Sequence, residues 1–112
     1  MAAYDLLAGC TGFVYALAQA YGMIAGGLSK RALVVGGDLL SRILDWQDRS
    51  TLVLFGDGAG AVVLEAAEQP GFLGFELGGV GGGGHHLWLP GSGSRVFEDA
   101  DRYVKMNGRE VF

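Results

Sequence analysis

The hydrophobic positions of the chain divide into one long pattern of helical period and several short runs of strand type. Between residues 13 and 24 the apolar side chains recur at helical spacing, with small residues on the other faces: Phe13, Leu17, Ala20, Tyr21 and Ile24, then Ala16, Ala18 and Ala25. A helix that is apolar on almost every side is typical of a buried helix. Gly26 and Gly27 predict its end, because glycine accepts the left-handed conformation common at helix C-termini.

Short apolar runs on either side of this helix predict strands. One covers residues 3–8, interrupted by Asp5, and a second covers residues 32–35, closed by Gly36, Gly37 and Asp38. Strand, helix and strand in this order predict a right-handed crossover onto a parallel sheet. Further strands are predicted at residues 59–66 and 72–77, the latter as a hairpin partner of the former. Residues 39–50 form a more polar connection, and residues 78–84 form a glycine-rich loop.

Composition and charge narrow the class of protein. Glycine supplies 21 of the 112 residues, half of the chain is hydrophobic and only 18% is charged, which argues against disorder and favours a tightly packed α/β chain. The net charge of −4 provides no basic surface for nucleic acid. The longest apolar stretch, residues 14–24, is broken by Gln19 and Gly22 and is shorter than the roughly 18 residues of a membrane span. With no secretory signal and a single cysteine, we expect a cytoplasmic protein.

The two ends predict an interior fragment of a longer protein. Residues 1–9 resemble the end of a buried segment, and residues 103–112 resemble the first turns of a helix. We therefore expect residues 1–112 to form a single partial domain that is incomplete at both ends.

Cys10 is the first candidate for chemistry, because it stands at the entrance to the predicted helix. Unpaired backbone N–H groups and the positive end of the helix dipole both favour a thiolate there. The same amides are able to hold the oxygen of a tetrahedral intermediate. The alternative is a buried, inert cysteine that acts as a small hydrophobic residue.

Three other features allow a functional and a structural interpretation. Residues 56–61 resemble a phosphate-binding loop, but their spacing and the strand that follows favour a tight structural turn. Arg49 is suited to clamping a phosphate or stacking on a purine, whereas the structural alternative is a surface ion pair with Asp45 or Asp48. His85 and His86 are expected to be solvated loop residues, since adjacent side chains diverge and no metal site is predicted; a Cys–His pair with the cysteine stays open.

Taken together, these stretches resemble the β-ketoacyl-acyl carrier protein synthase III family of thiolase-like condensing enzymes. The resemblance is carried by DLLAGCTGF at residues 5–13, ALVVGGD at 32–38, LSR at 40–42, DRST at 48–51, LFGDGAGAVVLE at 54–65 and MNGREVF at 106–112. It implies an α/β chain that forms part of one half of a five-layered thiolase-like fold, with a mixed sheet and a buried helix after the nucleophile.

The resemblance also implies an activity. The parent enzyme is expected to be an acyltransferase in which Cys10 accepts an acyl group from acyl-CoA. Condensation with malonyl-acyl carrier protein then initiates fatty-acid synthesis. Coenzyme A enters as a thioester substrate, and no cofactor is expected. Splitting acyl transfer from condensation makes each step easier. A homodimer is implied for the full-length protein.

Residue roles follow from the same resemblance. Contacts with coenzyme A are implied for Arg49, Ser50, Leu54, Met106, Gly108 and Phe112. An apolar pocket for the acyl starter is implied for Leu40, Phe55 and Leu87. Two features depart from the family pattern: residues 81–86 lack the acidic residue that the family often carries before Leu87, and the family's catalytic histidine and asparagine are expected beyond residue 112.

Rival interpretations remain at this point. One is another thiolase-like synthase, of polyketide type or a hydroxymethylglutaryl-CoA synthase. A different class is a non-catalytic acyl-CoA-binding or orphan fragment. We expect the 112-residue chain to be inactive by itself, because it carries only one of the three catalytic side chains implied by the resemblance.

Overall fold

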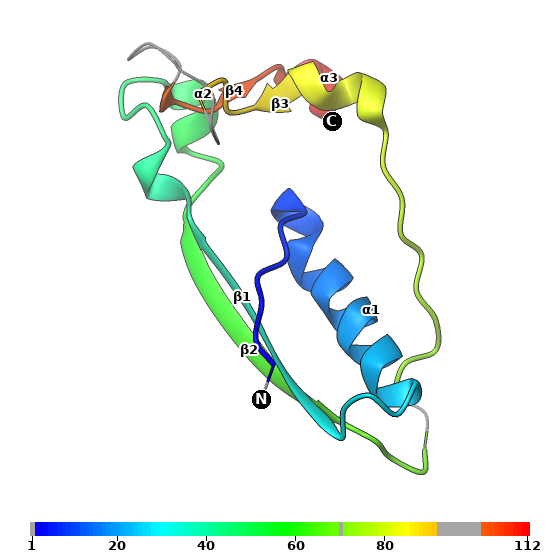
Figure 1. Cartoon of the computed structure of the whole chain (residues 1–112). Coiled ribbons are helices and arrows are strands. Elements are labelled where there is room, and N and C mark those ends of the chain that lie inside the picture. Colours follow the sequence, from blue (N-terminus) through cyan, green and yellow to red (C-terminus); the bar gives the residue numbers. More distant parts are fainter. Residues whose placement is uncertain (1, 70, 92–101) are drawn as a thin grey trace. The chain divides into compact units, whose positions relative to one another are not determined.

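The computed structural model describes residues 2–69, 71–91 and 102–112 and forms two compact units (Figure 1). The first unit comprises Met1–Gly37 and Ala59–Gly78, and the second comprises Asp38–Gly58 and Gly79–Phe112. Each has a small core of its own: Ala20 and Val34 are buried in the first unit, and Leu44 and Thr51 in the second. The assignment of residues 1–112 to one partial domain stays a prediction.

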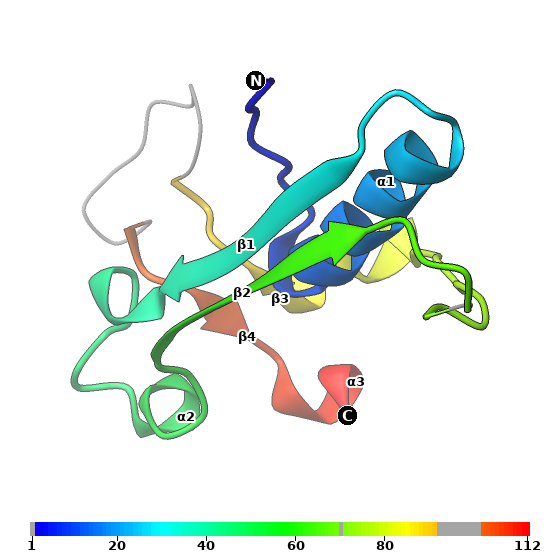
Figure 2. The ribbon, with the colours of Figure 1, turned by 90° about the horizontal axis from the view of Figure 1, so that it is seen from below.

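The first unit contains helix α1 (Gly12–Ala25) and most of a two-stranded sheet of β1 (Arg31–Leu39) and β2 (Asp57–Glu65). The end of β1 at residues 38–39 and the start of β2 at residues 57–58 belong to the second unit. The two strands run in opposite directions (Figure 2). Residues 2–8 form no strand and lie outside both sheets of the described chain. The strand predicted at residues 3–8 and its parallel pairing are therefore not formed here. A strand needs a neighbour for its N–H and C=O groups, and β1 pairs with β2 instead.

Helix α1 begins and ends where the sequence predicts. The N–H of Gly27 bonds to the carbonyl oxygen of Ile24 at 3.0 Å, and the N–H of Leu28 bonds to that of Met23 at 2.9 Å. Gly27 has a φ of 73°, so the helix ends in a left-handed glycine with both bonds of a Schellman motif. The apolar faces of α1 predict a buried helix, but only Ala20 of α1 is buried in this chain.

Strand β1 continues through Gly36 and Gly37, although the sequence predicts its end there. A Cβ on Gly36 would lie 2.9 Å from Cδ2 of Phe13, so the missing side chain leaves room for this ring of α1. Glycine here serves close packing and not a turn. Strand β2 likewise begins at Asp57; the tight turn predicted for residues 56–61 is wrong, since residues 57–61 belong to the ladder.

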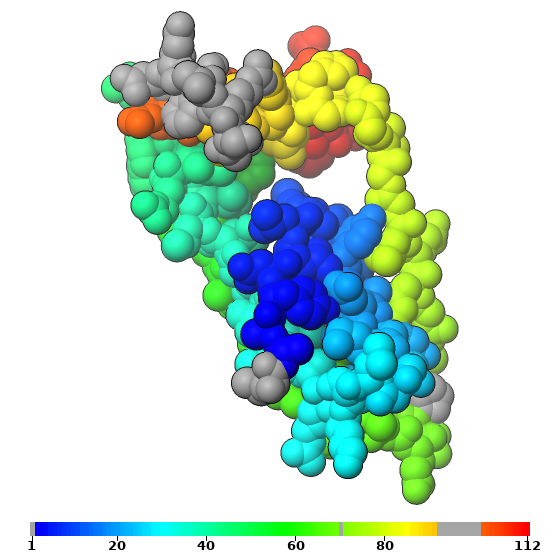
Figure 3. Space-filling view, viewed as in Figure 1, coloured from blue at the N-terminus to red at the C-terminus, as the bar shows by residue number. Residues whose placement is uncertain are grey.

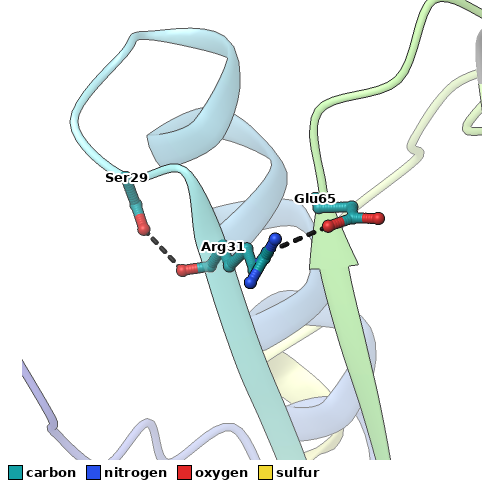
Figure 4. A network of polar contacts seen from close by, with 3 residues as sticks. All are labelled: Ser29, Arg31 and Glu65. Carbon is teal, nitrogen blue, oxygen red and sulfur yellow. Dashed lines mark hydrogen bonds and ion pairs between the residues drawn. The ribbon is translucent and has the colours of Figure 1, made fainter.

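Polar side chains join the far ends of these strands. The guanidinium of Arg31 at the start of β1 pairs with Glu65 at the end of β2, with Nε and Oε2 3.0 Å apart. The hydroxyl of Ser29 donates to the carbonyl oxygen of Arg31 at 2.6 Å (Figure 4). Both ion-pair side chains are more than half exposed, so we expect this pair to contribute little to stability.

Residues 72–77 form no strand, and the predicted hairpin with residues 59–66 is wrong. Instead, Phe72 and Phe75 both contact Tyr21 of α1, with ring centroids 5.6 Å apart in each case. Two rings three positions apart that meet the same helix residue do not fit the two-residue period of a strand. The hydroxyl of Tyr15 also donates to the carbonyl oxygen of Gly78 at 3.1 Å. This segment is therefore held by the helix and not by a ladder.

The second unit is built from short elements. In chain order these are η2 (Leu40–Arg42), α2 (Arg49–Leu52), η3 (Gly81–His86), β3 (Leu87–Trp88), β4 (Lys105–Met106) and α3 (Gly108–Val111). Strands β3 and β4 are antiparallel, with Leu87 opposite Met106. The N–H of Val104, the residue before β4, donates to the carbonyl oxygen of Ile43, the residue after η2, at 2.9 Å. The helix predicted within residues 103–112 is confined to α3.

Large hydrophobic side chains lie open on both units. Among the described residues, Leu73 is 98% exposed, Leu7 96% and Phe112 94%. The N-terminal segment and α1, dark to light blue, lie at the surface in the space-filling view (Figure 3). None of the helices in the described ranges is long and apolar enough to cross a membrane.

Candidate active site

Cys10 lies in the short helical turn η1 (Gly9–Thr11), which runs directly into α1. Gly9 has a φ of 56°, so the chain enters this turn through the left-handed region that glycine adopts most readily. The Cys10 side chain is exposed. Its predicted position at the start of the helix is confirmed, and the thiol is open to solvent in this chain.

The first turn of α1 has no side-chain cap. Thr11 is the N-cap residue, but its hydroxyl donates to the carbonyl oxygen of Ala8 at 3.0 Å and forms no bond with the helix. Amides at a helix N-terminus carry partial positive charge and favour an anion nearby. The local chemistry of Cys10 is that of an accessible thiol beside backbone donors, an arrangement suited to nucleophilic attack and to holding an oxyanion.

Asp48 organises the start of α2. Its Oδ1 accepts hydrogen bonds from the N–H of Ser50 at 2.9 Å and from the Ser50 hydroxyl at 2.6 Å, and its Oδ2 accepts one from the Thr51 hydroxyl at 3.0 Å. The hydrogen bonds from Ser50, and then that from Thr51, lower the pKa of Asp48 below its usual value, and the charge of Lys105 adds to this. The ionised carboxylate therefore fixes the helix turn that carries Arg49 and Ser50.

Arg49 is exposed at the first position of α2 and forms no ion pair within the described ranges. The structural alternative, a surface ion pair with Asp45 or Asp48, is not formed. Both carboxylates are engaged locally, because Asp45 accepts a hydrogen bond from the N–H of Gln47 at 2.9 Å and Asp48 is bonded to Ser50. The guanidinium thus remains available for an anionic ligand.

Leu87 and Met106 face each other across the β3–β4 pair. Directly beyond them, the N–H of Asn107 donates to the carbonyl oxygen of His86 at 2.7 Å. Gly108 begins α3, where a Cβ would lie 3.7 Å from Cε of Met106. A predicted acyl-pocket residue and two predicted coenzyme A contacts are thus brought together by one short ladder.

Ser41 and Asp57 join the segments that carry the other two predicted acyl-pocket residues. The N–H of Ser41 donates to Oδ1 of Asp57 at 2.8 Å, and its hydroxyl donates to Oδ2 at 2.6 Å. The Ser41 hydroxyl, and then its N–H, lower the pKa of Asp57 below the usual value. Leu40 precedes Ser41, and Phe55 lies two positions before Asp57; both are half-buried.

The imidazoles of His85 and His86 do not diverge as predicted, because their ring centroids are only 3.9 Å apart. The tight turns of η3 bring the two rings together. No cluster of three or more histidine, cysteine or acidic side chains suited to a metal occurs in the parts of the chain that are described. His85 is exposed and His86 is half-buried, so the predicted solvation holds fully only for His85. The prediction that no metal is bound stays a prediction.

The predicted site residues fall into both units. Cys10 belongs to the first, whereas all residues predicted to contact coenzyme A or the acyl starter belong to the second. Leu54 and Phe112 are both exposed. Leu54 lies two positions after the end of α2, and Phe112 directly follows α3.

Sequence reasoning missed two aspartates of the second unit: Asp48, which caps α2, and Asp57, which links its segment to Ser41. An aspartate directly before the first residue of a helix is a recognisable N-cap residue, so Asp48 was open to prediction. The bond between Ser41 and Asp57 spans 16 positions, and no local pattern marks it.

Comparison with known proteins identifies the family. A family model described as 3-oxoacyl-[acyl-carrier-protein (ACP)] synthase III matches residues 4–81, well over half of the chain. The chain belongs to this synthase III family. A Bacillus cereus β-ketoacyl-[acyl-carrier-protein] synthase III is 54% identical over 112 residues, covering 99% of this chain and 33% of that protein. The chain thus spans about a third of the length of the curated relatives it matches.

Solved structures that are more than 30% identical to this chain confirm the predicted thiolase-like α/β fold class. The Thermus thermophilus β-ketoacyl-[acyl carrier protein] synthase III aligns with a TM-score of 0.85 and 46% identity, covering 96% of this chain and 35% of that one. The priming β-ketosynthase of the R1128 polyketide pathway aligns with a TM-score of 0.80 and 34% identity, covering 96% and 33%. The resemblance found in the sequence motifs is confirmed.

Proposed function

We propose that the protein containing this chain is an acyltransferase that starts fatty-acid synthesis, with Cys10 as its nucleophile. The observation that carries the proposal is the exposed thiol at the uncapped start of α1, in a chain of the synthase III family. In this proposal the Cys10 thiolate attacks the carbonyl carbon of an acyl-CoA. The bond from that carbon to the sulfur of coenzyme A breaks, and the released thiolate takes up a proton.

Condensation follows from the acyl-Cys10 intermediate. Malonyl-acyl carrier protein loses carbon dioxide, and the resulting carbanion attacks the thioester carbonyl. The bond to the Cys10 sulfur breaks, so the thiolate is regenerated and a β-ketoacyl product two carbons longer leaves. A thiolate suits both steps, because it is a good nucleophile and a good leaving group.

The second unit supplies the proposed binding surface. Arg49 is exposed and unpaired within the described ranges, and it stands beside Ser50 at a turn fixed by Asp48, which suits the phosphates and adenine of coenzyme A. Leu54, Met106, Gly108 and Phe112 are proposed along the pantetheine arm, and Leu40, Phe55 and Leu87 around the acyl starter. We also propose a cytoplasmic homodimer that needs no metal or further cofactor.

The fatty-acid assignment is preferred to the polyketide alternative because curated relatives that are 47%, 51% and 54% identical are all named β-ketoacyl-[acyl-carrier-protein] synthase III. Its test is a condensation assay on the full-length protein with acetyl-CoA and malonyl-acyl carrier protein. We expect β-ketoacyl product from the wild type and none from Cys10→Ser. Equal product from both would refute Cys10 as the nucleophile, and no product from a folded wild type would refute the activity.

A further inference from the structure

The pair formed by Ser41 and Asp57 is a two-point attachment between segments far apart in the sequence. Both oxygens of one carboxylate are used, one by the Ser41 N–H at 2.8 Å and the other by its hydroxyl at 2.6 Å. Two bonds between the same residues fix orientation as well as distance. The lowered pKa of Asp57 follows from these bonds, so the carboxylate is ionised at neutral pH.

The attachment lies where the strands of the sheet separate. Strand β1 ends at Leu39 and β2 begins at Asp57, so the carboxylate continues the contact between the two segments beyond the last residue of β1. The N–H that it binds belongs to the peptide group linking Leu40 to Ser41. On the other side, Phe55 is separated from Asp57 by Gly56 alone.

We propose that Ser41 and Asp57 act as positioning residues that set the separation of Leu40 and Phe55, and thereby the length of acyl starter that the enzyme accepts. The inference rests on the proposed function, in which Leu40 and Phe55 line the acyl pocket. Neither Ser41 nor Asp57 needs to touch the substrate. Their role is to hold the Leu40–Ser41 peptide in one orientation, because pocket dimensions change discrimination between chain lengths more than they change the chemical step.

The test compares starters of different length in the full-length enzyme. Ser41→Ala removes the bond from the hydroxyl and keeps the bond from the backbone N–H. Ser41→Thr is the conservative variant, because threonine keeps a hydroxyl at this position. Asp57→Asn removes the negative charge. We would measure kcat and KM for acetyl-CoA, butyryl-CoA and octanoyl-CoA, together with thermal unfolding. For Ser41→Ala and Asp57→Asn we expect the ratio of kcat/KM between the shortest and longest starters to shift by at least about threefold. For Ser41→Thr, which keeps the hydroxyl, we expect a ratio close to that of the wild type.

The outcomes separate this inference from the proposed function. A shift in chain-length selectivity that occurs in Ser41→Ala and is absent from Ser41→Thr supports the positioning role. An unchanged ratio, or an equal fall for all starters with a lower unfolding temperature, shows that the pair only stabilises the fold and overturns the inference. A folded wild type that transfers no acyl group from any starter overturns the proposed function, and the inference with it. Ser41→Ala decides the matter even if Asp57→Asn fails to fold.

Discussion

The ring of Phe13 fills the space beside Gly36 that a side chain at that position would need. An ideal Cβ on Gly36 would lie 2.9 Å from Cδ2 and 3.3 Å from Cβ of Phe13. Phe13 stands three positions after Cys10, in the first turn of α1, and Gly36 stands within β1. The contact therefore ties the start of the helix, and with it the cysteine turn, to the sheet.

Gly36→Ala should destabilise the full-length protein because the added methyl group overlaps the Phe13 ring. We expect a loss of about 1–3 kcal/mol in the free energy of unfolding, the usual effect of overpacking. Gly37→Ala is the matched control, since its Cβ would meet Ala59 at an ordinary 3.8 Å. Chemical denaturation measures both. A loss for Gly37→Ala as large as for Gly36→Ala would contradict this account of the packing.

The same glycine shows what the sequence can and cannot predict. Helix α1 and its ending at Gly27 were predictable, because apolar period and glycine chemistry act locally. Gly36 and Gly37 predict the end of a strand, since the sequence alone does not show that Phe13 packs there. Phe72 and Phe75 are a second example. Local propensity predicts a strand for residues 72–77, but the packing of both rings against Tyr21 overrides that propensity.

In the candidate site, too, features set by local sequence were predictable and contacts between distant segments were not. The place of Cys10 at the start of a helix follows from local sequence, and the family motifs extend the prediction over the second unit. The bond between Ser41 and Asp57 depends on chain topology and was not predicted. Whether Arg49 is free or paired stays open in the local sequence, because it depends on which neighbouring carboxylates find partners of their own.

Asp48→Ala should weaken acyl-CoA binding in the full-length enzyme while leaving the chemical step almost unchanged. The substitution removes the cap of α2, so Arg49 and Ser50 lose their fixed orientation. We expect KM for acetyl-CoA to rise by roughly threefold to tenfold with little change in kcat, in line with the loss of a helix cap. Asp48→Asn is the control, because asparagine caps about as well. A drop in kcat with constant KM would contradict a positioning role.

The pH dependence of the Ser41–Asp57 pair follows from the direction of its pKa shift. The pKa of Asp57 is lower in the folded chain than its usual value near 4. The stabilisation is therefore complete above about pH 4 and is lost as pH falls through the lower, folded value. In Asp57→Asn this part of the acid dependence should disappear, as measured by denaturation at a series of pH values. Parallel curves for wild type and variant would refute the coupling.

The 112-residue chain should neither condense nor unfold cooperatively by itself. Residues such as Leu7 and Leu73 are almost fully exposed in it, and exposed apolar surface of this kind favours association. We expect binding of a hydrophobic dye, concentration-dependent aggregation and no β-ketoacyl product. A monomer with one sharp thermal transition would contradict this expectation.

The central claim is that Cys10 carries the acyl group, and the most direct measurement is its location by mass spectrometry. The full-length protein would be mixed with acetyl-CoA in the absence of malonyl-acyl carrier protein, quenched in acid and digested. The account predicts one acetyl group on the peptide that contains Cys10, removed by hydroxylamine and absent from Cys10→Ser. An acetyl group on a different residue of the wild type, or transfer that persists in Cys10→Ser, would contradict it.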